Sequence, residues 1–310
     1  MFGRVSAIAM NTYREAVRAR ILVGLLALAL ATSGYSLVIA AMSLRQETRI
    51  VADIGSSSMS LYAVLVAVIL GATSLYRELE LKTIFPILTR RLRRHEYVVG
   101  KYLGILATLL VFIAIDGASV LTIMAIQSQQ HIGLTIGAGV FMLVVLGILL
   151  WRATYSRVFV VLPWSIALFL VMMLLCNGAA DERQVVVVSA LLTLGEVVIV
   201  GAIAMVFSSF SSPSLTAVFT AWLFLIGRSA DTLANIPERV FGSTIRTIGL
   251  VLAKVVPNLN IYVPARPLLL GQVASTPIWG YVGRAWVNSI LYAAVLLTLS
   301  AVVFRKRDFQ

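Results

Sequence analysis

Long apolar runs dominate the chain, and charged residues are concentrated in the segments between them. A membrane-spanning helix needs about 20 mainly apolar residues, and eight runs are candidates. They cover residues 21–42, 61–76, 102–127, 133–150, 158–176, 185–210, 215–227 and 286–304. The pattern predicts an all-α polytopic membrane protein with about eight transmembrane helices. An even number of spans places both termini on the same side of the membrane.

Composition supports this class. The chain is 60% hydrophobic and only 12% charged, and its mean hydropathy is +0.97, whereas a soluble domain carries about 25% charged residues. The net charge of +12 is compatible with nucleic-acid binding, but the basic residues lie beside the apolar runs, where positive charge faces the cytoplasm and anionic headgroups. No basic groove module is visible. We therefore expect membrane lipid, and not nucleic acid, as a partner.

Lysine and arginine in the short connections predict the orientation. On one side of the membrane, the two ends of the chain and two connections are rich in arginine. The opposite short loops mix a few arginines with carboxylates. The basic side holds Arg4, Arg14, Arg18, Arg20, the segment 77–101, Arg152, Arg157, Arg305, Lys306 and Arg307. The positive-inside rule therefore places this side, and both termini, in the cytoplasm.

The first 20 residues have a helical pattern of their own. Val5, Ala9, Tyr13 and Val17 recur every four residues, and three charged residues lie off that line. This spacing predicts an amphipathic helix in the cytoplasmic interface that leads into the first span. The alternative is a signal peptide, because Ala27–Leu28–Ala29 resembles a cleavage site. The apolar run continues to residue 42, which favours the uncleaved helix.

Residues 228–284 form a loop too long to be an ordinary connection. Apolar clusters at 248–253 and 263–270 alternate with Pro257, Pro264 and Pro267. We expect short amphipathic pieces that rest on the outer membrane face. A loop of this length is usually functional or disordered, and its apolar content argues against disorder.

Residues 77–100 are a charged island between two apolar runs. Acidic residues and a lysine precede the apolar stretch 84–88, and a block of arginines follows it. An apolar plug flanked by charges can seat in a groove of a soluble partner, while the charges fix its register. A merely solvated loop accounts for the arginines but not for the exposed apolar stretch. The pattern therefore predicts a cytoplasmic docking surface.

Asp116 and Glu196 lie at membrane depth. Because a charge at the centre of a span costs at least about 2.5–3.5 kcal/mol, each is expected to face protein or water. One interpretation is a proton or cation relay, and the other is a hydrogen-bonded carboxyl that ties helices together. No lysine or arginine within the predicted spans is an evident partner, so we favour the structural role for both.

The sequence FSSFSSPS, residues 207–214, joins the sixth and seventh runs. Its hydroxyls can satisfy carbonyl groups that are freed where the proline interrupts the helix, so a tight reversal can lie close to lipid. Contact with a substrate is the alternative. The residues expected to form this reversal are Ser208, Ser209, Ser211, Ser212 and Pro213.

Patterns for metal binding and bond chemistry are absent from the sequence. His95 and His131 fall on opposite membrane faces in the predicted topology, and Cys176 is the only cysteine. Gly100–Lys101 does not end a nucleotide-binding loop, because Tyr102 replaces the required serine or threonine and no strand precedes it. We expect no metal, no cofactor and no ATP hydrolysis in this chain.

Several segments resemble ABC-2 type ABC transporter permeases. RELELKTIFPILTRRLRRHEYVVGKYLG resembles the segment after their second span, which has an acidic pair, Thr-x-x-x-x-Leu, a basic stretch and Gly-Lys. Residues 191–227, Pro257–Asn258–Leu259 and the C-terminal FRKRDF are similar to the same family and occur in the same order. The nearest branch is that of multi-copper-enzyme maturation permeases, including the one serving nitrous oxide reductase. The copper label has no support in the residues.

The resemblance implies a single permease domain over residues 1–310, with no nucleotide-binding domain. Residues 1–20 would be an elbow helix, and residues 77–100 a coupling segment that grips a cytoplasmic ABC ATPase. Two ATPase copies would bind ATP and Mg, and a second permease, identical or homologous, would complete an exporter in a bacterial inner membrane. The docking role falls on Glu78, Glu80, Lys82, Thr83, Pro86 and Leu88.

The family usually has six spans, so residues 133–176 look like an inserted hairpin. Two other functions remain open. A stand-alone proton-coupled carrier would use Asp116 or Glu196 and would show inverted repeats, of which none is evident. A membrane enzyme acting on lipids would need clustered catalytic polar groups near one interface, and the sequence shows none.

Overall fold

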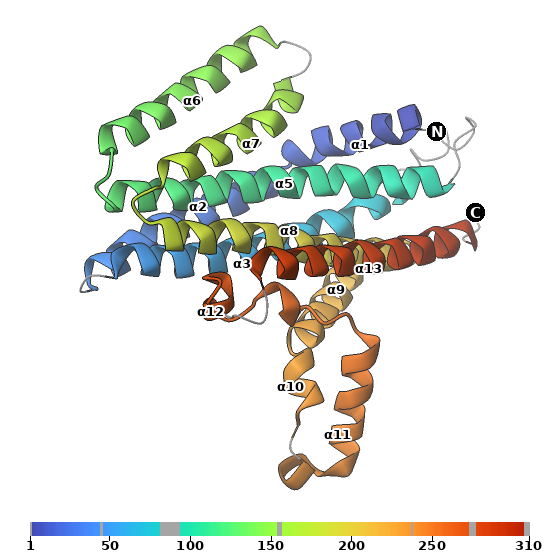
Figure 1. The fold of residues 1–310 in the computed structure, drawn as a ribbon. Helices are drawn as coiled ribbons and strands as arrows, with labels where there is room; N and C mark the ends of the chain where they lie inside the picture. The colour runs from blue at the N-terminus through green and yellow to red at the C-terminus, as the bar shows by residue number, and fades with distance from the viewer. Residues whose placement is uncertain are drawn as a thin grey trace.

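The computed structural model describes residues 2–43, 46–80, 94–153, 157–236, 238–272 and 277–306, and every element in them is helical. The side chains of 2, 75–80, 94, 238–241, 254 and 305–306 are outside this description. The helices are α1 (Phe2–Val17), α2 (Arg20–Ala41), α3 (Glu47–Glu80), α5 (Arg94–Gln127), α6 (Ile132–Arg152), α7 (Arg157–Leu175), α8 (Ala180–Ser208), α9 (Pro213–Arg228), α10 (Ala230–Ala234), α11 (Glu238–Val255), η1 (Asn260–Tyr262), α12 (Arg266–Leu269) and α13 (Ile278–Lys306) (Figure 1).

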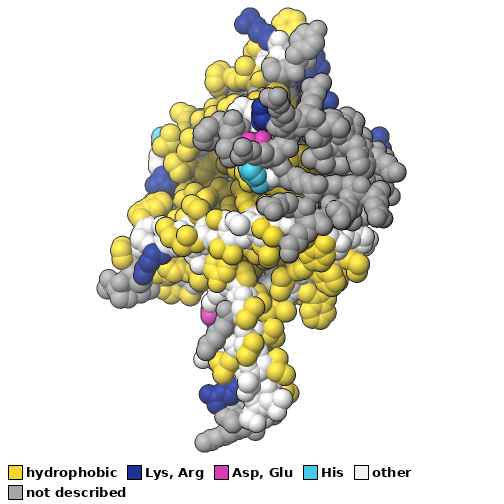
Figure 2. All heavy atoms as spheres, turned by 90° about the vertical axis from the view of Figure 1, so that its right-hand side faces the viewer, with side chains coloured by type: hydrophobic (Ala, Val, Ile, Leu, Met, Phe, Trp, Pro, Cys, Tyr) yellow, Lys and Arg dark blue, Asp and Glu magenta, His cyan; other side chains and the backbone are white. Residues whose placement is uncertain are grey.

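Seven helices in the described part of the chain are long and apolar enough to cross a membrane: α2, α3, α5, α6, α7, α8 and α13. The all-helical, polytopic membrane class predicted from the sequence is thus confirmed. The two chain ends lie at the same end of the bundle (Figure 1). We call this the basic end, because Arg14, Arg18, Arg152 and Arg157 belong to it. Seen from there, lysine and arginine side chains surround the periphery among hydrophobic ones (Figure 2).

The predicted span 215–227 is not an eighth long helix. It lies in α9, which has 16 residues and is therefore only about 24 Å long, against a hydrocarbon core of about 30 Å. α9 starts at the basic end and stops with Arg228 beside Glu196, near the middle of α8. The described residues thus contain seven long apolar helices, and the eighth predicted run is a shorter one, because length in apolar residues does not say where a helix stops.

Between the end of α9 and the start of α13, the described residues form four helices shorter than the seven long ones: α10, α11, η1 and α12. After α9, helices α10 and α11 project from the side of the bundle (Figure 1). The chain returns at Leu259, whose N–H donates to the carbonyl of Gly227 at 2.9 Å. It then follows α8 toward its start, where Gln184 Nε2 donates to the carbonyl of Leu269 at 2.9 Å. This broken path brings the chain to the end of the bundle opposite the basic end, where α13 begins; we call it the outer end, after the orientation predicted from the sequence.

Three predicted spans begin eight or more residues earlier than expected: α5, which starts at Arg94 and not at residue 102, and also α3 and α13. α3 starts at Glu47 and not at residue 61. Of the polar residues before Leu61, Ser58 and Ser60 are buried in the bundle, while Asp53 and Ser57 are exposed. α13 starts at Ile278 and not at residue 286. The predicted run began only after Arg284, but this arginine lies exposed near the start of the helix and does not interrupt it. The core is centred on α8, the most buried span, and the least buried is α6, which forms a peripheral hairpin with α7 (Figure 1).

The amphipathic helix α1 packs across the start of α5. Gly100 and Gly104 allow this approach: a Cβ on Gly104 would lie 2.5 Å from the carbonyl oxygen of Ala9. Tyr13 is buried, stacks on Phe159, and donates from its hydroxyl to the carbonyl of Val158 at 3.1 Å. Burial raises the pKa of Tyr13 to about 12, so its hydroxyl keeps the proton for this bond at neutral pH.

Candidate functional site

An ion pair between the buried Glu196 and Arg228 lies at the centre of the bundle. Glu196, in the middle of α8, is 0% exposed, and its Oε1 accepts a hydrogen bond from Arg228 Nη1 at 2.5 Å. Its other oxygen, Oε2, accepts from Ser60 Oγ of α3 at 3.0 Å. Arg228 Nη2 is 3.4 Å from the same Ser60 hydroxyl. One ion pair thus joins α3, α8 and α9.

The position of Arg228 follows from α9. As the last residue of that helix, its positive charge lies at the negative end of the helix dipole. Its guanidinium also packs 5.7 Å from the centroid of the Phe224 ring, one turn earlier. The side chain of Arg228 remains 28% exposed. A buried carboxylate is therefore held by a cation that still reaches an accessible surface.

That surface is a polar cavity of about 380 Å³ between α3 and α8. It extends from Arg228 and Ser60 to Asp53, which lies seven residues earlier on α3, a distance of about 10 Å along the helix. Helical spacing puts several hydroxyl groups on the same wall, one turn apart. The hydroxyl-bearing residues that line it are Ser56, Ser57, Ser60, Ser189 and Thr193.

An ion cluster closes the outer end of this cavity. Arg266, at the start of α12, donates hydrogen bonds to both Asp53 of α3 and Glu182 of α8. Arg49 lies 3.9 Å from Asp53 on the same helix. Asp53 is about half exposed, whereas Arg266 and Glu182 are 19% and 16% exposed, so the cluster is solvated only on its Asp53 side. It is the polar rim of the site.

Tyr262 of η1 forms part of the wall of the cavity. It is buried, and its hydroxyl donates to the carbonyl of Ala285 at 3.1 Å and lies 2.7 Å from the hydroxyl of Ser289. Gly195 makes room for the ring: a Cβ there would lie 3.1 Å from Tyr262 Cε1. The outer loop, which the sequence placed on the membrane surface, thus enters the bundle beside Glu196.

Asp116 occupies a different place. It is fully buried on α5, and its Oδ1 accepts from Ser33 Oγ of α2 at 3.3 Å. Its Oδ2 has no hydrogen-bond partner among the described residues. The two membrane carboxylates are therefore not brought together: Asp116 connects α2 to α5, and Glu196 is bound to Arg228 and Ser60, which line the cavity.

The predicted reversal lies between α8 and α9. Three of its serines donate to carbonyls one turn earlier: Ser208 to Met205 at 3.2 Å, Ser209 to Val206 at 2.6 Å and Ser211 to Phe207 at 2.8 Å. Ser212 is the N-cap residue of α9 but makes no side-chain capping bond, and Pro213 is the first residue of that helix. None of the five lines the polar cavity.

The predicted docking residues can be located only in part. Glu78 and Glu80 belong to the last turns of α3, and nothing is described of their side chains. Lys82, Thr83, Pro86 and Leu88 lie outside the described residues. The helices on either side, α3 and α5, have 34 residues each. Each is thus about 51 Å long, which exceeds the hydrocarbon thickness of about 30 Å.

The side chains of the polar cavity are suited to binding polar groups. The cavity presents hydroxyls and the guanidinium of Arg228, which can bind a carboxylate or another oxyanion. Within the described parts of the chain, no three His, Cys, Asp or Glu residues are placed to hold a metal ion. No protein-family model matches this chain, and no characterised protein matches its sequence. The geometry and the sequence patterns therefore carry the functional argument.

Proposed function

We propose that this chain is the membrane-spanning permease subunit of an ABC-2 type transporter. The observation that carries the proposal is the arrangement at the basic end. An amphipathic helix, α1, packs across α5, and two 34-residue helices lead into and out of the charged segment 77–100. Such long helices extend beyond the hydrocarbon layer and can carry that segment to a soluble partner.

In this proposal ATP is hydrolysed, with Mg, by a separate cytoplasmic ATPase present in two copies, and a second permease completes the transporter. The ATPase grips residues 77–100. Because α3 is continuous from Glu80 to Ser60, a push at its end is transmitted about 30 Å to the cavity. There it changes the contact between Ser60 and the Glu196–Arg228 pair. The direction is export from a bacterial inner membrane.

Docking is tested by co-purification. The full chain, tagged and extracted from its native membranes in mild detergent, is expected to bring down an ABC ATPase. The Glu78→Lys/Glu80→Lys variant should lose at least about 90% of it, because like charges across an interface are repulsive. The control is Glu47→Lys/Asp181→Lys, the same charge change at exposed residues of the outer end, and it should retain the ATPase.

Two results would contradict this proposal: no ATPase with the native chain in any detergent, or equal loss from both variants. In that case the proton-coupled carrier becomes the better candidate. Its specific support is Asp116, whose buried Oδ2 has no hydrogen-bond partner in the described structure. An Asp116→Asn variant in proton-flux assays then tests that function.

The orientation gives a separate prediction. In a Cys176→Ser background, Gln129→Cys, in the exposed turn between α5 and α6, should react with an impermeant maleimide in intact cells. Arg152→Cys, exposed at the basic end, should react only after the cells are permeabilised, since arginine-rich connections stay in the cytoplasm. The reverse labelling pattern would show that the termini are outside.

A further inference from the structure

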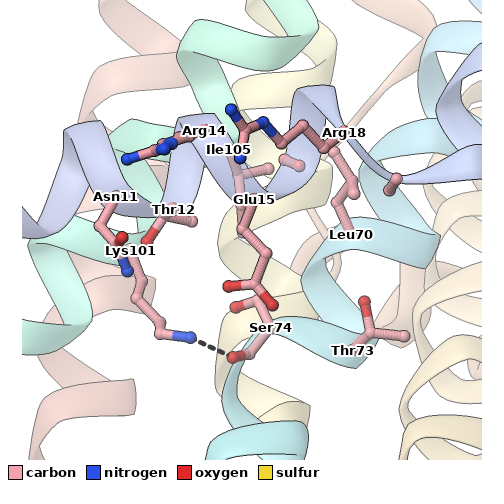
Figure 3. A pocket seen from close by; sticks show the side chains of 12 residues that line it. Asn11, Thr12, Arg14, Glu15, Arg18, Leu70, Thr73, Ser74, Lys101 and Ile105 are labelled. Atoms are coloured by element: carbon pink, nitrogen blue, oxygen red, sulfur yellow. Dashed lines mark hydrogen bonds between the residues drawn. The ribbon is translucent and has the colours of Figure 1, made fainter. Parts of the chain in front are cut away.

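A second cavity lies at the basic end, away from the polar site. It measures about 520 Å³ and is enclosed by α1, the end of α3 and the start of α5. Figure 3 shows how its residues lie: Arg14 and Glu15 come from α1, Arg18 follows directly after it, and Lys101 reaches below that helix from α5. The cavity is therefore shared by the amphipathic helix and the two helices that flank residues 81–93.

The charges around this cavity are unequal. Arg14, Arg18 and Lys101 are cationic and Glu15 is the one carboxylate among the described residues that line it, a net charge of +2. Lys101 is only 2% exposed, and its ammonium group donates to the carbonyl of Ser74 (Figure 3). The two arginines are exposed. One cation is thus fixed at the bottom while two at the rim remain able to reach a ligand.

The rest of the lining is apolar or hydroxylic, apart from the amide of Asn11. Leu70 and Ile105 form part of it, and Thr12 and Thr73 add hydroxyls. Leu70 lies within the span Glu47–Ser74, one turn from its last residue. The cavity therefore begins at the level of the headgroups and continues toward the hydrocarbon layer. A ligand that matches both parts has an anionic head and an apolar tail.

We propose that this cavity binds the headgroup of an anionic phospholipid. The phosphate is held by Arg14 and Arg18, since guanidinium groups form paired, charge-assisted hydrogen bonds to phosphate. The buried ammonium group of Lys101, which donates to the carbonyl of Ser74, adds positive charge below it. Glu15 accepts a hydrogen bond from a headgroup hydroxyl. Leu70 and Ile105 are 7% and 1% exposed, so they form an apolar floor below the headgroup, and the acyl chains extend into the surrounding lipid. The inference requires only membrane insertion and does not depend on the proposed ATPase.

The site has a consequence for the inner leaflet. Anionic lipids are enriched on the cytoplasmic face, where they attract basic segments close to a membrane-spanning helix. A lipid bound here would contact α1, α3 and α5 at once. It would thereby stabilise the packing of α1 against the bundle, because a ligand that binds only the folded form raises its stability.

The test uses the full chain in a neutral detergent. Dihexanoyl phosphatidylglycerol is titrated while the unfolding temperature is followed, and dihexanoyl phosphatidylcholine and glycerol 3-phosphate are titrated in parallel. The native chain should be stabilised by phosphatidylglycerol at concentrations where the other two have little effect. For Arg14→Gln/Arg18→Gln, the concentration needed for the same shift should rise about tenfold or more.

The control is Arg152→Gln/Arg157→Gln, which removes two exposed arginines from the same end but none from the cavity. It should keep the native response. Equal weakening in both variants would mean that only the general positive charge attracts lipid, and the proposed site would be wrong. A response to glycerol 3-phosphate equal to that of phosphatidylglycerol would identify a site for free phosphate and overturn the lipid assignment.

Discussion

Replacing Arg228 by methionine is expected to lower the free energy of unfolding by about 3–5 kcal/mol, the cost of leaving a buried charge without its partner. Glu196 would then remain 0% exposed, with Ser60 as its one other described side-chain partner. The converse change, Glu196→Gln, should cost less, because the side chain of Arg228 is 28% exposed and retains partial hydration. Unfolding in mixed micelles with increasing SDS measures both.

The double variant Glu196→Gln/Arg228→Met separates an ion pair from ordinary packing. It should be more stable than Arg228→Met alone, since replacing both members of a buried pair is often close to neutral. Arg284→Met is the control: this exposed arginine donates only to the carbonyl of Gly280 in its own helix. If Arg228→Met costs no more than Arg284→Met, the buried pair does not form in the membrane protein.

The sequence was sufficient to predict the long helices. Runs of about 20 apolar residues without charge have few structural alternatives in a chain of this hydropathy. The helix over the first 20 residues was recognisable because its charged residues fall on one face. The buried face differs in detail: it is centred on Thr12, Tyr13 and Ala16. Packing against Gly100 and Gly104 decides which face of α1 is buried. The sequence pattern of α1 alone does not contain this information.

The polar cavity could not be predicted in the same way. Arg228 follows an apolar run, so the sequence assigned it to the outer loop and found no partner for Glu196. The partnership depends on where α9 stops, which is decided by its packing against α3 and α8. Similarly, the predicted second span started only after the serines at 56, 57 and 60, because polar residues were read as its end. Their shared helix face becomes visible only once α3 is known to start at Glu47.

The position of the outer loop, residues 228–284, could also be predicted only in part from the sequence. Its prolines and apolar clusters predicted short pieces, and η1 and α12 are indeed short. Their place inside the bundle rests on two long-range features: the ring of Tyr262 beside Gly195, and Arg266 between Asp53 and Glu182. One signal was present in the sequence. Asp53, Glu182 and Arg266 were all assigned to the outer side, where opposite charges can pair.

Substituting Gly104 by valine is expected to release α1 from the bundle. A Cβ at this position would lie 2.5 Å from the carbonyl oxygen of Ala9 and 2.6 Å from Thr12 Cβ. Both helices would have to separate, and such overpacking typically costs about 1–3 kcal/mol. Hydrogen exchange, followed by mass spectrometry, should then become faster across residues 2–17, while α8 keeps its protection because it does not contact that position.

Gly137→Val on α6 is the matched control, because a Cβ there has no heavy atom within 4 Å. It should leave the exchange of α1 unchanged, since it makes the same chemical change at a helix position with open space. The Gly104 variant should also lose its response to phosphatidylglycerol, as the rim arginines of the basic-end cavity lie on α1 (Arg14) and directly after it (Arg18). Faster exchange with an unchanged lipid response would show that α1 is loosened at Gly104 without forming the lipid site. Unchanged exchange in both variants would show that α1 does not depend on this contact.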